Sequence, residues 1–176
     1  MLLSIALLGL MALPQATASS HAASSSQTPD VTLPPANARV KATVVGLGVQ
    51  VYQCSAKEGG YAWTLEMPEA TLFDPATHQP VGTHGEGPTW TWMDGSAVTG
   101  EVLQTRASDV AGSVPWLLLE THSTGAANGE LADVKLVRRS ETQAGAVPAT
   151  GCDAVHQNIV LRVPYQATYT FYTTSE

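Results

Sequence analysis

"YAWTLEM", residues 61–67, carries a large apolar side chain at every odd position and a small or polar one at every even position. Successive side chains of an extended strand point to opposite faces, so this alternation predicts a β-strand with one apolar face. Residues 165–172, YQATYTFY, repeat the pattern, with three aromatic residues and one alanine sharing a face. Two such stretches, well separated along the chain, favour an all-β fold.

The remaining apolar stretches are short and separated by turn residues. Glycine-rich turns are expected at 58–60, 94–96, 125–129 and 145–151. Gly46-Leu47-Gly48 lacks the third glycine of a dinucleotide-binding loop, and we interpret it as a turn or a bulge. The sequence therefore predicts a β-sandwich or jelly-roll-like barrel of about ten short antiparallel strands with one disulfide. Strands are expected at 40–45, 49–54, 61–67, 70–73, 89–93, 97–104, 116–121, 132–139, 159–163 and 165–172.

The amino-terminal region is expected to lie outside the folded domain. Residues 1–18 are uncharged and apolar up to a proline, and they end in small residues, which is typical of a signal peptide. About a dozen apolar residues fall short of the roughly 20 that span a membrane, so we expect no membrane span. Residues 19–35 are predicted to form a flexible Ser/Ala/Pro-rich lead-in, and 36–176 a single β domain. The protein is thus expected to be exported, to the periplasm or outside the cell.

The expected export bears on the redox state of the two cysteines, Cys54 and Cys152. In an oxidising compartment a lone pair of cysteines is expected to form a disulfide. Closing a loop of about 100 residues would stabilise the fold by roughly 4 to 5 kcal/mol. The alternatives are two buried free thiols or a thiol nucleophile, but neither cysteine has a base beside it in the sequence.

Composition excludes some classes of partner. The formal net charge is −7, and only eight residues are Lys or Arg. So few cations cannot form a phosphate-neutralising face, which argues against nucleic acid and against an anionic membrane surface. No cofactor and no bound metal are expected.

Several motifs, in order, resemble an uncharacterised secreted family, the domain of unknown function 3455. The resemblance covers roughly residues 30 to 172 and implies an exported domain with no assigned catalytic residues. The motifs are YQC (52–54), GTHGEGPTWTWMDGSAVTGEV (82–102), PWLLLETHSTG (115–125), KLVRRSETQAGAVP (135–148), GCD (151–153) and VPYQATYTFY (163–172).

The stretch GTHGEGPTW, residues 82–90, is the candidate functional site. His84 and Glu86 would share one face of an extended chain, with Asp94 on the next turn, as a hydrogen-bonding or acid/base set. We predict that His84 is partly accessible in a cleft with a carboxylate nearby. In the alternative interpretation the glycines only permit tight turns, and His84 bonds to the backbone of a loop.

Tryptophans could extend this site. Trp90 and Trp92 alternate with threonines and share a face, which would be an aromatic platform if outward and core if inward. We favour core for both, and we expect Trp63 and Trp116 to be core as well. The preferred function is a non-catalytic domain binding a small molecule, glycan or cell-surface partner. The alternative is an enzyme, possibly metal-assisted, with its site at His84, Glu86 and Asp94.

Overall fold

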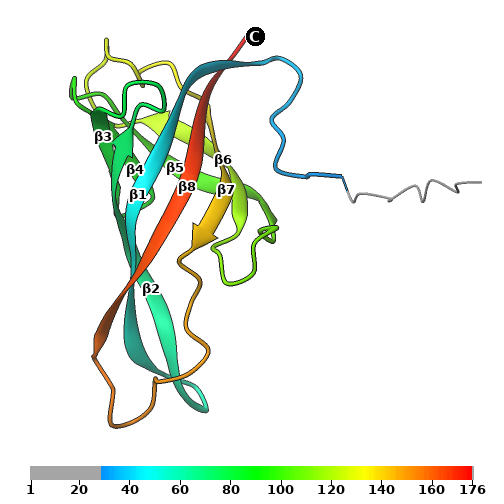
Figure 1. Ribbon diagram of the computed structural model, residues 1–176. Helices are drawn as coiled ribbons and strands as arrows, with labels where there is room; N and C mark the ends of the chain where they lie inside the picture. The colour runs from blue at the N-terminus through cyan, green and yellow to red at the C-terminus, as the bar shows by residue number, and fades with distance from the viewer. Residues whose placement is uncertain (1–28, 176) are drawn as a thin grey trace, which may run out of the picture.

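The computed structural model describes residues 29–175, which form one antiparallel sheet closed into a barrel (Figure 1). Each strand pairs with its neighbour in sequence, and the last strand pairs with the first. The all-β prediction is confirmed, with eight strands in place of about ten. They are β1 (Ala38–Lys57), β2 (Gly60–Phe73), β3 (Pro80–Gly85), β4 (Thr89–Trp92), β5 (Ala97–Arg106), β6 (Trp116–Ser123), β7 (Leu136–Ala144) and β8 (Val160–Thr174).

The strand count is lower because three pairs of expected strands are continuous. In β1 the two stretches run through Gly46-Leu47-Gly48, so the prediction of a turn or bulge there is wrong. A Cβ at Gly48 would lie 2.0 Å from the Glu69 carbonyl oxygen, and one at Gly46 would lie 2.6 Å from the Tyr169 ring. These glycines allow close approach of neighbouring groups within the sheet.

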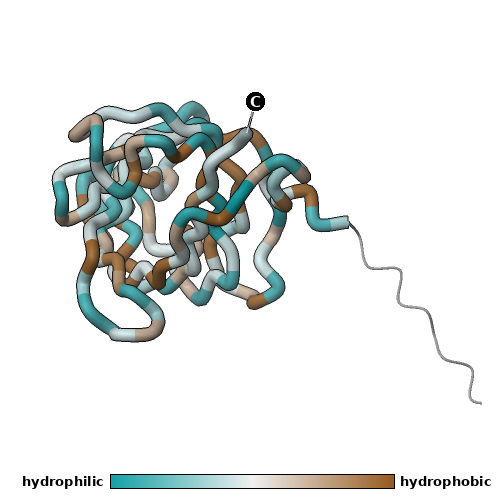
Figure 2. The backbone as a smooth tube through the Cα atoms, turned by 90° about the horizontal axis from the view of Figure 1, so that it is seen from above, coloured by the Kyte–Doolittle hydropathy of each residue, from teal (hydrophilic) through white to brown (hydrophobic). Residues whose placement is uncertain are grey.

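The core lies inside the barrel, on the face set by the period-two alternation. Trp90, Tyr169 and Phe171 are among its largest fully buried side chains, together with Leu72 and Leu119. Burying an aliphatic or aromatic side chain of this size stabilises a fold by about 1.5 to 3 kcal/mol. Seen from above, the chain winds around this interior with hydrophobic and hydrophilic residues interspersed along the wall (Figure 2).

Strands β1, β2 and β8 run beyond the rest of the barrel as a three-stranded extension, at the bottom of Figure 1. There the segment between β7 and β8 crosses to β1 and is joined to it by the disulfide Cys54–Cys152, whose cysteines are 98 residues apart. The predicted crosslink is confirmed. Gly60–Glu69 of β2 pairs with β1 alone, because β3 begins its pairing only at Ala70.

The chain before β1 also contacts the barrel wall. Asp30 accepts hydrogen bonds from the backbone N–H and the hydroxyl of Thr32. It also forms an ion pair with Arg138, with 2.7 Å between the carboxylate oxygen and Nη2. Thr32 is fully buried. Asp30 and Thr32, which we predicted within a flexible lead-in, are therefore bonded to the barrel through Arg138. The predicted signal peptide lies outside the described residues. No helix long and apolar enough to cross a membrane occurs in residues 29–175.

Candidate functional site

The stretch GTHGEGPTW is a β-hairpin made of the end of β3, a tight turn and the start of β4. His84 pairs with Trp90, and Gly85 with Thr89. The turn needs Gly87, whose φ of 75° lies in the left-handed region. Gly82 is needed for another reason, because a Cβ there would lie 2.3 Å from the Thr91 carbonyl oxygen. The sequence did not predict β3, because its two inward positions carry Gly82 and His84 instead of apolar side chains.

His84 points into the barrel and is only 3% exposed. Its ring stacks on Trp90 with the ring centroids 4.5 Å apart, and it meets the edge of Tyr169. Nδ1 lies 2.9 Å from the Thr89 carbonyl oxygen, so Nδ1 carries the proton and donates. Burial lowers the pKa of His84 to about 4, and the charge of Arg139 adds to this against the opposing effect of the Thr89 hydrogen bond. The expectation of an accessible histidine is wrong, because His84 is buried and hydrogen-bonds to the backbone, as the alternative interpretation expected, although its partner Thr89 lies in a strand and not in a loop.

The two carboxylates do not join His84. Glu86 is exposed on the hairpin turn. Asp94 caps the next loop, where one oxygen accepts from the backbone and hydroxyl of Ser96 and the other from the backbone of Glu130. These hydrogen bonds, that from the Ser96 hydroxyl most of all, lower the pKa of Asp94. Within residues 29–175 no group of three or more His, Cys, Asp or Glu side chains could hold a metal ion.

The burial of the four tryptophans differs in part from the prediction. Trp90 is 1% exposed, as expected for core, and Trp92 is half-buried with its ring edge-on to Phe171. They form no outward platform. The prediction that Trp63 and Trp116 are core is wrong, because both are half-buried at the surface. The indole of Trp116 lies beneath two guanidinium groups, those of Arg106 at 4.3 Å and Arg138 at 5.1 Å from the ring centroid.

Trp63 lies in a groove on the barrel extension that we call the Trp63 groove. One part, of about 460 Å³, is formed where the segments 113–115 and 146–147 approach the extension, and a second part of about 330 Å³ continues it past residues 147–150. Leu65 is 49% exposed, Val147 54% and Tyr61 38%, so the walls are apolar and open to solvent. The groove is lined mainly by Tyr52, Tyr61, Trp63, Leu65 and Val147.

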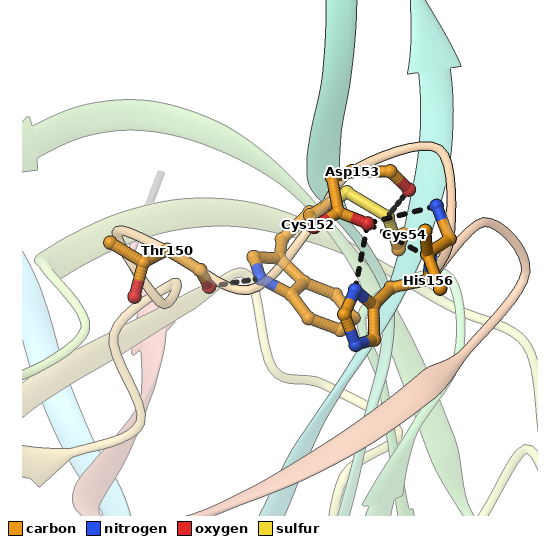
Figure 3. Close-up of a disulfide and its surroundings, with 7 residues drawn as sticks. Cys54, Thr150, Cys152, Asp153 and His156 are labelled. Carbon is orange, nitrogen blue, oxygen red and sulfur yellow. Dashed lines mark hydrogen bonds and ion pairs between the residues drawn. A yellow bond between two sulfur atoms is a disulfide. The ribbon is translucent and has the colours of Figure 1, made fainter.

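The orientation of the Trp63 indole is fixed by the neighbouring loop. Its Nε1 donates a hydrogen bond of 2.8 Å to the Thr150 carbonyl oxygen. Thr150 lies two residues before Cys152, and the disulfide holds this loop against β1 (Figure 3). Beside the disulfide, Asp153 accepts a hydrogen bond of 2.7 Å from Nδ1 of His156. The crosslink thus supports the loop that positions the indole.

The floor of the groove contains a buried tyrosine. This residue is Tyr52, which is 4% exposed and donates its hydroxyl to the Gly145 carbonyl oxygen at 2.7 Å. Burial raises the pKa of Tyr52, which keeps this hydroxyl neutral. The YAWTLEM stretch supplies Tyr61, Trp63 and Leu65. Their shared face was predicted, but alternation alone does not indicate whether another part of the chain covers that face.

Comparison with known proteins identifies a family and nothing more specific. Residues 34–173 match the family described as "Protein of unknown function (DUF3455)", so the chain belongs to that family and the resemblance of its motifs is confirmed. No curated protein and no solved structure matches the chain.

Proposed function

We propose that this member of the DUF3455 family is an exported, non-catalytic domain that binds a small molecule or glycan in the Trp63 groove. The observation that carries the proposal is the indole of Trp63. It is half-buried, held by its Nε1 hydrogen bond to Thr150, and flanked by the exposed apolar side chains of Leu65 and Val147. An aromatic face held in one orientation loses little conformational freedom when it binds a ligand.

The groove favours a ligand with a flat apolar face. Aromatic rings contribute a large contact area, and Trp and Tyr suit sites where one end of the side chain meets water and the other meets apolar atoms. A sugar ring presenting its C–H groups, or a planar aromatic molecule, would stack on the indole between Leu65 and Val147. The hydroxyl of Tyr61, a partly exposed residue that also lines the groove, would supply a polar contact.

The enzyme alternative receives no support from the arrangement of its residues. His84 bonds to a backbone carbonyl inside the barrel, and Asp94 is occupied with Ser96 and Glu130. A general base must reach a substrate proton with a suitable pKa. A buried histidine whose pKa is about 4 does not meet that requirement near neutral pH.

Export is supported by two independent features. The apolar start of the sequence is typical of a signal peptide, and the two cysteines are joined. Disulfides persist in oxidising compartments such as the periplasm and the extracellular space. A fusion of residues 1–35 to a reporter that is active only after export would test this part of the proposal. A reporter that stays inactive contradicts it.

The binding proposal is tested with the exported protein, purified without reductant. An array of glycans and a set of planar aromatic compounds would be screened, and hits measured by calorimetry. Trp63→Ala is expected to weaken binding by about 5-fold to about 150-fold, since stacking on an indole contributes on the order of 1 to 3 kcal/mol. Trp116→Ala, which removes a second half-buried indole outside the groove, is the matched control and should bind normally. Equal affinity in the Trp63 variant and the parent protein would exclude the groove as the site.

A further inference from the structure

Over Gly60–Glu69, one edge of β2 has no strand beside it within residues 29–175. Gly60–Glu69 is bonded to β1 on one side, and β3 pairs with β2 only from Ala70 onward. On the other side of β1, Cys54 donates its N–H to the Ile159 carbonyl oxygen and accepts from the N–H of Asn158. The main-chain groups of Cys54 therefore point away from β2.

The direction of the Cys54 groups fixes the direction of those in β2. Cys54 lies opposite Trp63, and residues directly opposite in an antiparallel pair either both bond to each other or both point outward. Trp63 thus directs its N–H and C=O out of the open edge. Because the pattern alternates along a strand, Tyr61 and Leu65 do the same. Three residues present a row of donors and acceptors suited to another extended strand.

This part of the edge lacks the features that usually prevent strands from pairing across molecules. Exposed edges are commonly protected by charged residues, proline or a bulge. Residues 60–65, GYAWTL, contain no charge and no proline. The bulge in β2 occurs at Glu66, where the register with β1 shifts, and Pro68 lies beyond it. The open row therefore ends at Leu65 and is unprotected up to that point.

We propose that a second copy of this chain occupies the edge, with the two β2 strands antiparallel about a two-fold axis at Trp63. A strand that pairs with this edge must be extended and uncharged, with apolar residues at alternate positions and a free edge of its own. The β2 strand of a second copy has all of these properties. In this register Tyr61 lies opposite Leu65 of the second copy and Ala62 opposite Thr64. No two like charges face each other, and the contact is isologous, as in most dimers.

The dimer goes beyond the proposed ligand binding, and it is measured without any ligand. The purified exported protein is expected to sediment as a dimer in a concentration-dependent equilibrium. Leu65→Pro removes an outward N–H and adds a ring at the edge, while the pairing of β2 with β1 keeps its hydrogen bonds. It is expected to raise the dissociation constant at least tenfold.

The matched control is Leu103→Pro. Leu103 is 47% exposed against 49% for Leu65, and it is the residue skipped in the register between β5 and β6, where proline is tolerated. This variant should dimerise like the parent protein. A parent protein that is monomeric up to millimolar concentration, or a Leu65→Pro variant that dimerises as well as the parent, overturns the proposal.

Hydrogen exchange of the parent protein gives a second test that needs no variant. The amide protons of Tyr61, Trp63 and Leu65 should exchange more slowly as protein concentration rises, because the dimer bonds them. The amide of Leu103 provides the internal comparison and should exchange at a rate independent of concentration. Edge amides that exchange at the same rate at every concentration would exclude pairing through β2. They would do so even if the protein formed a dimer through another surface.

Discussion

Protonation of His84 is predicted to destabilise the barrel as the pH falls from about 6.5 to 4. The folded protein holds this imidazole neutral, with its pKa lowered from 6.5 to about 4, chiefly because the ring is buried. The unfolded chain releases the ring to water, where it binds a proton more readily. Since the unfolded state then holds more protons, the free energy of unfolding must decrease as the pH falls through this range.

The magnitude follows from the two pKa values. At pH 7 both states are mostly neutral, so nearly all of the stability is present. At pH 5 the unfolded chain is almost fully protonated at this site while the folded one is not, which costs about 2 kcal/mol. The loss approaches about 3 kcal/mol below pH 4. Asp94 and other carboxyl groups with lowered pKa titrate below that range, so they contribute little at pH 5.

The assay is urea unfolding, followed by circular dichroism at pH 7, 6 and 5, on the parent protein and on His84→Gln. The glutamine variant is expected to be less stable at pH 7, because it loses the stacking on Trp90, but to lose about 2 kcal/mol less than the parent between pH 7 and 5. Parallel pH profiles for the two proteins would refute the reasoning, as would an imidazole that titrates near 6.5 in the folded state by nuclear magnetic resonance.

Further predictions concern the crosslink, the glycines and the amino-terminal anchor. Exported protein should contain no free thiol by titration without reductant, and Cys54→Ala should lower the free energy of unfolding by about 4 to 5 kcal/mol in urea. Gly48→Ala should lower the free energy of unfolding by about 1 to 3 kcal/mol, because its Cβ would meet the Glu69 backbone. Gly85→Ala should change it by less than about 0.5 kcal/mol, because its Cβ would contact nothing within 4 Å. Equal losses of stability in the two variants would contradict this account. Asp30→Asn should lower stability by at most about 1 kcal/mol in the same assay, and less at high salt, since the ion pair with Arg138 is partly exposed.

Local patterns in the sequence predicted the fold class well. The alternation in YAWTLEM and YQATYTFY is a property of the strands themselves. The disulfide was predictable because the sequence holds only two cysteines, Cys54 and Cys152. Strand boundaries were less predictable, because Gly46 and Gly48 have two possible roles. A glycine can mark a turn, or it can allow close approach within a sheet, and only its neighbours across the sheet decide which.

The candidate site was predicted less well, for a related reason. GTHGEGPTW concentrates residues that often serve catalysis, yet His84 is directed inward by the same alternation that defines β3. Trp63 was predicted as core because its strand carries other apolar residues on the same face. That face extends beyond the barrel, where the chain covers it only partly. How far a strand projects past its neighbours depends on pairings between distant segments.

The pairing of β8 with β1 has a consequence for how the protein is made. Ala38 pairs with Thr174 and Gln53 with Val160, so the first and last strands of the barrel hold each other along most of their length. A chain emerging from the ribosome cannot close this barrel until its final residues are synthesised, and contacts between such distant segments form slowly. In the export proposed above, this delay would keep the chain unfolded and therefore still able to be threaded across a membrane.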